Sequence, residues 1–277
     1  MKLGDSRVDT NGFDRHEYTV DGTRTVVYSA GSGDPLVYFH GAGTFHGFDF
    51  ARQWTDQFRV FVPYHPGFGE SEDNLRIGTM RDYIRHYVDL FEQMDLDRFC
   101  LVGCSMGGRM AAEFAATQSQ CIERLALVCP AGLQVPEHPM TNLADIPPAE
   151  IFDYLVHDKV VLQPFLPTGP DSEFVAMRER EAASLGRILQ EGSLINLKLA
   201  AQLRRIGIPT LLLWGAEDRV IPAAQAPIWA SLLPNPSIYI VPDAGHLVLD
   251  ESPTARTAVQ EFLVRSTSAR QARGRAR

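Results

Sequence analysis

The sequence predicts an α/β fold in which helices cover both faces of a mostly parallel β-sheet. Short runs of β-branched and aromatic residues recur along the chain, and turn residues bound each run. From the third run onward, strand-like runs alternate with helix-like stretches, which is the pattern of a parallel sheet buried on both faces. The predicted strands are Thr25–Ala30, Leu36–His40, Val60–Pro63, Phe99–Gly103, Leu125–Cys129, Thr210–Trp214 and Ile238–Val241.

Helical periodicity places the helices between these strands. In Thr79–Met94, apolar residues three and four positions apart share one face, which is typical of a helix packed on a sheet. Ser105–Thr117 and Pro253–Val264 have the same character. We therefore expect a core domain formed by residues 1–133 and 204–265.

The alternation of predicted strands and helices is interrupted in the middle of the chain. Residues 134–203 hold seven prolines up to Pro170 and then the helix-like stretches Ser172–Leu189 and Ser193–Leu203. A helical insertion between two strands is expected to form a cap over the sheet edge where ligands bind. The alternative is a subdomain that packs without touching substrate. Residues 266–277 are basic and of low complexity, and we expect a disordered tail.

Composition and charge exclude several classes of partner. The chain has 277 residues, of which 45% are hydrophobic, enough for one substantial core. Its net charge of −8 repels nucleic acid and anionic membrane surfaces, so we expect neither as a partner. The first residues lack the apolar segment of a secretion signal, which predicts a soluble, cytoplasmic protein with a small-molecule substrate. A homo-oligomer is compatible with the sequence, but nothing indicates one.

The cysteines do not suggest a metal site. Cys100, Cys104, Cys121 and Cys129 lie in or beside apolar runs, and no histidine follows at zinc-site spacing. We expect buried thiols and predict neither a metal nor another cofactor. Cys104 is a conceivable nucleophile beside Ser105, but strand alternation points it away from the position of Ser105.

Ser105 is the predicted nucleophile. An apolar strand runs directly into Gly103-Cys-Ser-Met-Gly107, and a helix pattern follows. Gly-x-Ser-x-Gly in this strand-to-helix context is the nucleophile-elbow motif, in which the glycines make room for a tight turn. The serine hydroxyl is then presented at the carboxyl edge of the sheet, and the helix N-terminus faces a developing oxyanion.

A serine hydroxyl needs a base, and the base needs an orienting carboxylate. His246 follows the last predicted strand on a loop that contains Gly245, so we predict it as the base. Asp218 follows the strand Thr210–Trp214, which completes the order Ser, Asp, His. Glu217 is its nearest rival as the acid, followed by Asp243 and Asp250.

Two backbone N–H groups are expected to bind the oxyanion. One is that of Met106, and the other lies in the loop after Leu36–His40, where we assign Ala42, with Gly43 as the alternative. His40 could be mistaken for a second base, but its place at a strand end predicts a hydrogen bond that fixes the loop.

Together these motifs resemble the α/β-hydrolase superfamily over nearly the whole chain. The resemblance implies an eight-stranded sheet, a cap inserted after strand six, and the same three catalytic residues. It also implies that Ser71 serves as a turn former. The stretches that carry it are His40-Gly41, Pro66–Ser71, Gly103–Gly108, Trp214–Asp218 and Gly245-His246.

Within this superfamily, the serine nucleophile argues against branches whose nucleophile is aspartate. The Ser105–Gly108 stretch resembles both carboxylesterases or lactonases and hydrolases that cleave carbon–carbon bonds in ring-cleavage products. The latter commonly have Trp after the catalytic histidine and a Gly-Pro-Gly oxyanion loop, whereas this chain has Leu247 and Gly43-Thr44. We rank ester or lactone hydrolysis first and carbon–carbon cleavage second. A ligand receptor with little turnover and a cofactor-free haloperoxidase-like side activity are further alternatives.

Candidate substrate contacts come from the cap and from the loops at the sheet edge. Apolar cap residues suit aromatic or acyl groups, but core packing explains each of them equally well. Arg178 and Arg180 could bind a substrate carboxylate, although a solvated helix face explains them better. The candidates for substrate binding are Gly43, Phe165, Phe174, Met177 and Leu247.

Overall fold

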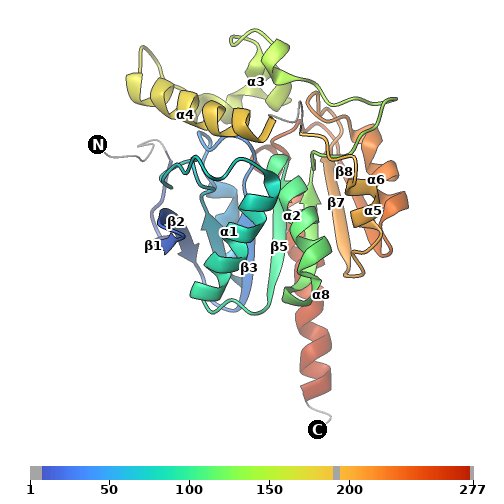
Figure 1. Cartoon of the computed structure of the whole chain (residues 1–277). Coiled ribbons are helices and arrows are strands. Elements are labelled where there is room, and N and C mark those ends of the chain that lie inside the picture. Colours follow the sequence, from blue (N-terminus) through green and yellow to red (C-terminus); the bar gives the residue numbers. More distant parts are fainter. Residues whose placement is uncertain (1–7, 190–193, 275–277) are drawn as a thin grey trace.

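The structure is a computed structural model that describes residues 8–189 and 194–274; the side chains of residues 265–274 are not described. Its centre is one eight-stranded sheet with the order β1-β2-β4-β3-β5-β6-β7-β8 (Figure 1). β1 and β4 pair with β2 in antiparallel orientation, and all other neighbours are parallel. The strands are β1 Asp14–Val20, β2 Thr23–Ala30, β3 Asp34–Phe39, β4 Phe58–Pro63, β5 Phe99–Cys104, β6 Ile122–Val128, β7 Thr210–Gly215 and β8 Pro236–Val241.

The predicted fold class is confirmed, and all seven predicted strands are present with ends that differ by a few residues. β1 was not among the strands predicted from the residues. Its sequence DRHEYTV is mostly charged or polar and largely exposed, because it lies at the edge of the sheet. An edge strand needs little apolar surface, so its sequence signal is weak.

Helices cover the sheet on both faces. α1 (Met80–Gln93) and α2 (Met106–Thr117) pack together on one face, where α2 contacts β3, β5 and β6. α8 (Pro253–Gly274) covers the other face, as Figure 1 shows, and the 3-10 helix η1 (Asp49–Trp54) contacts α8 and β4 there. The short helices α6 (Ala226–Leu232) and α7 (Val248–Glu251) were not predicted from the sequence.

Two sequence expectations about helix ends are corrected. α8 continues to Gly274, within the segment expected to be a disordered tail. That segment contains Ala, Arg and Gln, all good helix formers, and no proline, so a helix already docked on the sheet can propagate through it. The other correction concerns Ser193–Leu203, where the helix α5 spans only Leu199–Leu203; Ser193 lies outside the described residues.

Hydrogen bonds of Asn196 explain why α5 begins further along the chain than predicted. Its side-chain amide donates to Glu113 Oε1 at 2.9 Å, and its side-chain oxygen accepts from the N–H of Lys198. Its backbone N–H donates to the carbonyl of Gly132. These contacts hold the chain in a turn just before the helix.

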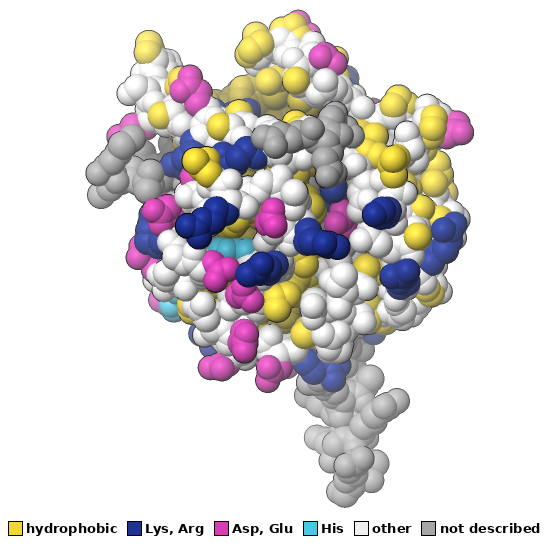
Figure 2. Space-filling view, viewed as in Figure 1, with side chains coloured by type: hydrophobic (Ala, Val, Ile, Leu, Met, Phe, Trp, Pro, Cys, Tyr) yellow, Lys and Arg dark blue, Asp and Glu magenta, His cyan; other side chains and the backbone are white. Residues whose placement is uncertain are grey.

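The segment between β6 and β7 is helical, as the sequence predicts. It contains η3 (Leu143–Asp145), α3 (Ile151–Leu155), η4 (Lys159–Phe165), α4 (Ser172–Ile188) and α5. Figure 1 shows α3 and α4 above one edge of the sheet, and Figure 2 shows hydrophobic side chains gathered on this upper part. α5 instead contacts α2 and α6 beside the sheet. Within the described ranges, no helix has the length and apolar character needed to cross a membrane.

Candidate active site

Ser105 occupies a strained turn between β5 and α2. Its φ of +56° and ψ of −118° lie in a region that side chains other than glycine rarely adopt. The turn is tight because Gly107 touches the end of β3: a Cβ there would lie 2.2 Å from the carbonyl oxygen of Phe39. A Cβ on Gly103 would lie 2.4 Å from the carbonyl oxygen of Gly107. The two glycines of the motif are therefore both required by close backbone contact.

Ser105, His246 and Asp218 form one chain of hydrogen bonds. His246 Nε2 lies 2.9 Å from Ser105 Oγ, and His246 Nδ1 lies 2.8 Å from Asp218 Oδ2. A carboxylate only accepts hydrogen bonds, so Nδ1 carries the proton and Nε2 is left to accept from the serine hydroxyl. Asp218 and His246 are buried, whereas Ser105 is partly exposed. The structure thus brings together the three residues predicted from the sequence.

The rivals of Asp218 lie elsewhere. Glu217 and Asp243 are exposed to solvent. Asp250 forms a buried ion pair with His46, whose Nδ1 is 3.0 Å from its Oδ1. Burial lowers the pKa of His46, but the charge of Asp250 and the hydrogen bond between them outweigh this and raise it overall.

The loop after β3 passes directly beside the serine. A Cβ placed on Gly41 would be 3.4 Å from Ser105 Cβ and 3.9 Å from its Oγ. Ala42 and Gly43 follow, and both are partly exposed. Met106 is the first residue of α2, where backbone N–H groups have no acceptor within the helix. Both predicted oxyanion donors therefore belong to segments that adjoin Ser105.

His40 fixes this loop, as predicted. Its Nδ1 lies 2.7 Å from the carbonyl oxygen of Gly41, and its Nε2 accepts from the N–H of His65 at 3.0 Å. Burial lowers the pKa of His40 far below the ordinary value and that of His65 to about 3. Both rings are neutral at physiological pH, which lets His40 Nε2 act as an acceptor. Ser71 has the predicted role of turn former, since its hydroxyl donates to the carbonyl of Tyr64.

The cysteines near the site are poor nucleophiles. Burial, together with the charges of Asp250 and Asp218, raises the pKa of Cys104. Burial and the charge of Asp218 also raise that of Cys129. Since the thiolate is the reactive form, neither thiol competes with Ser105.

Among the described residues, one group has the spacing of a metal site. Ligand atoms of Cys129, Asp218 and His246 lie within 4.8 Å of one another. The aspartate and histidine atoms already bind each other, however, and the thiol is held protonated by its raised pKa. The arrangement suits proton transfer better than a cation, and the expectation of no metal stays a prediction.

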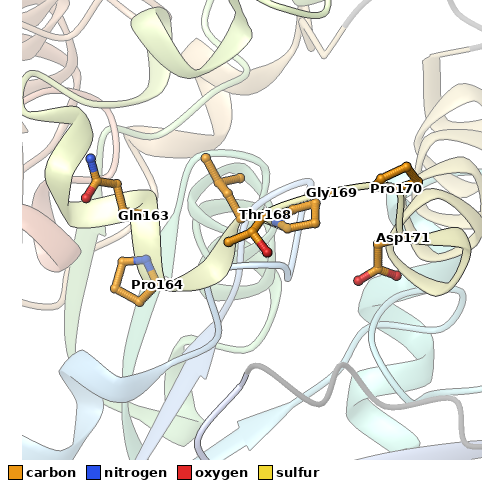
Figure 3. Close-up of a pocket in the computed structure, with 8 residues that line it drawn as sticks. Gln163, Pro164, Thr168, Gly169, Pro170 and Asp171 are labelled. Atoms are coloured by element: carbon orange, nitrogen blue, oxygen red, sulfur yellow. The ribbon is translucent and has the colours of Figure 1, made fainter.

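Two hollows lie at the cap. The larger, of about 590 Å³, is open and is lined only by cap residues between Gln163 and Asp171, which Figure 3 shows along the connection from η4 to α4. The second, of about 310 Å³, lies between Phe165 and Pro164 of the cap and the core residues His46–Asp49. Phe165, a predicted substrate contact, thus faces the segment that continues the loop after β3.

The other predicted substrate contacts pack between cap and core. Phe174 lies against Phe45, with ring centroids 6.3 Å apart. Met177 and Leu247 are buried, and the N–H of Leu247 donates to the carbonyl of Leu155 in the cap. Their contact with substrate stays a prediction.

Two residues of α4 lie beside the loop: Arg178, which the sequence analysis favoured as part of a solvated helix face, and Glu181, which it did not single out. Arg178 lies over the ring of Phe45, 5.2 Å from its centroid, and its Nη1 is 3.1 Å from where a Cβ on Gly43 would be. Glu181 is buried against the same loop. The signal for both is their spacing from Phe174 along α4, four residues for Arg178 and seven for Glu181, which puts all three on one helix face.

Comparison with known families decides the classification. The sequence of residues 36–260 matches the α/β hydrolase family. This chain belongs to the α/β hydrolase family. The eight-stranded sheet, with its helical insertion between β6 and β7, agrees with this assignment.

Relatives of this α/β hydrolase differ in the bonds they cleave. It is 26% identical to a 2-hydroxy-6-oxo-6-(2'-aminophenyl)hexa-2,4-dienoic acid hydrolase of Metapseudomonas resinovorans, over 84% of each chain. It is 27% identical to monoacylglycerol lipase ABHD6 of Mus musculus, over 74% of this chain and 66% of the lipase. The crystal structure of a membrane phospholipase A superposes with a TM-score of 0.79 at 25% identity, covering 94% of this chain and 89% of the other. The relatives are hydrolases of small molecules.

Proposed function

We propose that this α/β hydrolase cleaves a carboxylic ester or lactone of a small, largely apolar substrate through an acyl-enzyme on Ser105. The observation that carries the proposal is the hydrogen-bond chain from Ser105 Oγ through His246 to Asp218, with contacts of 2.9 and 2.8 Å. This is the geometry that converts a serine hydroxyl into a nucleophile.

In the first step, Ser105 Oγ attacks the carbonyl carbon while its proton moves to His246 Nε2. Asp218 holds the imidazole and stabilises the cation that forms. His246 then passes the proton to the leaving alcohol as the carbon–oxygen bond breaks, and the acyl group remains on Ser105. In the second step, water attacks the acyl-enzyme with His246 as the base and releases the acid.

The oxyanion of each tetrahedral intermediate would be bound by the N–H groups of Ala42 and Met106. The approach of Gly41 to Ser105 and the start of α2 at Met106 support this assignment. Removing such a donor typically costs about 3 kcal/mol of transition-state stabilisation.

The apolar character of the substrate follows from the surroundings of the loop. An aromatic cluster of Phe45, Phe152 and Phe174 lies between the loop and the cap. The ring centroids of Phe45 and Phe152 are 5.6 Å apart. We also propose a cytoplasmic location, because all four cysteines are free thiols, which suits a reducing compartment.

A substrate panel tests the proposal. Short p-nitrophenyl esters, lactones and ring-cleavage products would be assayed with the wild type and Ser105→Ala in parallel. We expect ester or lactone turnover by the wild type and its loss in the variant. Full activity of Ser105→Ala on these substrates would contradict the proposal.

Carbon–carbon cleavage of a ring-cleavage product is the second candidate. Arg178 favours it, because a guanidinium beside Gly43 can bind the carboxylate of such a substrate. The relative from Metapseudomonas resinovorans carries the name of such a hydrolase. Rapid bleaching of a yellow ring-cleavage product with poor ester turnover would select this candidate, and binding with no more than one turnover would point to a receptor.

A further inference from the structure

Glu181 connects the cap to two loops of the core. It lies on α4, and only 1% of its surface is exposed. Its Oε2 accepts from the N–H of Thr44 at 3.2 Å, and its Oε1 accepts from the hydroxyl of Thr44 and, at 3.1 Å, from the N–H of Gly69. One buried cap carboxylate thus satisfies three donors from the core.

Thr44 is the far end of the loop that carries Ala42. At its near end, the loop is fixed by His40, which accepts from the N–H of His65. At its far end it is fixed by Glu181, whose Oε2 lies 3.9 Å from where a Cβ on Gly43 would be. The three residues between these anchors are Gly41 to Gly43, and Gly41 lies directly beside Ser105. The two anchors therefore set where the N–H of Ala42 points.

The contacts of Glu181 require a carboxylate. All three partners donate, and an ionised carboxylate offers acceptors on both oxygens. A buried carboxylate is costly unless its hydrogen bonds are satisfied, so an apolar residue would attach the cap at lower cost. The carboxylate at this position is therefore explained by control of geometry rather than by stability.

We propose that Glu181 is a positioning residue that aligns the oxyanion loop when the cap is seated. The cap then does more than cover the substrate, because the Ala42 N–H is correctly placed only when α4 is docked on the core. Glu181 touches neither substrate nor Ser105 in this role and acts only through Thr44. The inference rests on the proposed serine hydrolase function.

α4 has other anchors, so a change at Glu181 can be interpreted. Ser184 donates to the carbonyl of Gly67 at 3.3 Å, and Arg187 forms an ion pair with Asp73. Arg180 donates to the carbonyl of Gly69. The helix is therefore expected to stay docked when the carboxylate is replaced by an amide of the same shape.

The test is Glu181→Gln, assayed on the best ester of the panel. The amide keeps one acceptor oxygen but presents its NH2 group to the N–H of Thr44, so this end of the loop loses the hydrogen bond that holds its backbone. We expect kcat to fall about 10- to 100-fold, because a small misplacement of an oxyanion donor has such an effect, while KM changes less than about threefold. The affinity for a boronic acid that forms a tetrahedral adduct on Ser105 should fall in parallel with kcat/KM.

The affinity for unreacted substrate distinguishes a role of Glu181 in positioning the oxyanion loop from a role in attaching the cap. The Kd of the ester would be measured in Ser105→Ala and in the double variant with Glu181→Gln, and we expect equal values. Thr44→Val, which removes only the hydroxyl donor and leaves the backbone N–H bound, should lower kcat less than Glu181→Gln does. Glu179→Gln, on the exposed side of α4, is the matched control and should behave as the wild type.

A Glu181→Gln variant that unfolds at a lower temperature but keeps kcat and boronic acid affinity within about twofold would overturn the inference and leave a structural role. Failure of the proposed function is a different result, in which Ser105→Ala keeps its activity. If Ser105→Ala is inactive and Glu181→Gln is fully active, only the positioning role is wrong.

Discussion

Asp218 holds His246 through one oxygen and its own loop through the other. Asp218 Oδ2 is 2.8 Å from His246 Nδ1, while Oδ1 accepts from the N–H groups of Val220 and Ile221, each at 2.8 Å. Backbone hydrogen bonds therefore hold the carboxylate in the orientation that places Oδ2 against His246. The imidazole has one orientation and one tautomer, in which Nε2 can take the proton of Ser105.

Asp218→Asn is expected to inactivate the enzyme without unfolding it. The asparagine oxygen still accepts from the two N–H groups, but its NH2 group donates to Nδ1 and forces the proton onto Nε2. A histidine in that tautomer cannot accept from Ser105, and kcat should fall by about 10⁴-fold. Steady-state kinetics together with thermal unfolding measure the two effects.

Glu217→Gln serves as the control for that experiment. Its side chain is exposed, and we expect unchanged kcat and KM. Loss of activity in Glu217→Gln with retention in Asp218→Asn would reverse the assignment of the acid.

Gly107→Ala should damage both stability and activity. A Cβ would lie 2.2 Å from the carbonyl oxygen of Phe39 and 2.3 Å from that of His40, and neither backbone group can move freely. We expect a loss of about 3 kcal/mol in the free energy of unfolding, the upper range for overpacked sites. Urea denaturation gives the value. Wild-type stability in this variant would show that the elbow is less tightly packed than these distances indicate.

Gly186→Ala, in the cap helix α4, should stabilise the protein, in contrast to Gly107→Ala. Gly186 lies within α4, and nothing lies within 4 Å of a Cβ placed there. Alanine is about 1 kcal/mol more favourable than glycine in a helix, so the variant should be more stable by roughly that amount. A decrease in the urea midpoint would contradict the helical assignment at this residue.

The pair formed by His46 and Asp250 should make stability depend on pH. The folded state raises the pKa of His46 above its ordinary value of 6.5, because Asp250, aided by Glu181, outweighs burial and the charge of Arg178. A raised pKa contributes stability fully below the unfolded value and loses it as the pH rises through the folded value. The difference in melting temperature between wild type and His46→Gln should therefore be largest below pH 6.5 and narrow above it.

His138→Gln is the control, since His138 is exposed. Its melting temperature should follow that of the wild type at every pH. A gap between wild type and His46→Gln that widens as the pH rises would contradict the sign of the shift.

Alkylation of thiols should leave the enzyme active. Burial and nearby carboxylates raise the pKa values of Cys104 and Cys129, and both side chains are inaccessible. Iodoacetamide at neutral pH is expected to modify Cys121 first, because it is the most exposed of the four. Activity that disappears in step with modification of Cys104 would restore this thiol as a candidate nucleophile.

The elements around Ser105 could be predicted because their sequences encode local rules. An apolar strand, a glycine-flanked serine and a helix pattern occur together at residues 99–117, and each has one structural meaning. His246 and Asp218 could be placed because parallel strands deliver their following loops to one edge of the sheet.

The cap contacts could not be predicted in the same way. Glu181 lies 137 residues from Thr44 in the chain, and nothing in the local sequence of α4 distinguishes it from the exposed Glu179. Only the packing of α4 on the core decides which glutamate is buried. The C-terminal helix was predicted, but its extension past Val264 was not, since composition alone does not show that a docked helix continues into a basic segment.

The central claim is that Ser105 carries the acyl group. The most direct measurement is to mix the enzyme with p-nitrophenyl acetate, quench it within the burst phase, and locate the acetyl group by peptide mass spectrometry. The account predicts one acetyl group per chain on the peptide with Ser105, a matching burst of p-nitrophenol, and neither in Ser105→Ala. An acetyl group on another residue, or turnover in Ser105→Ala, would contradict it.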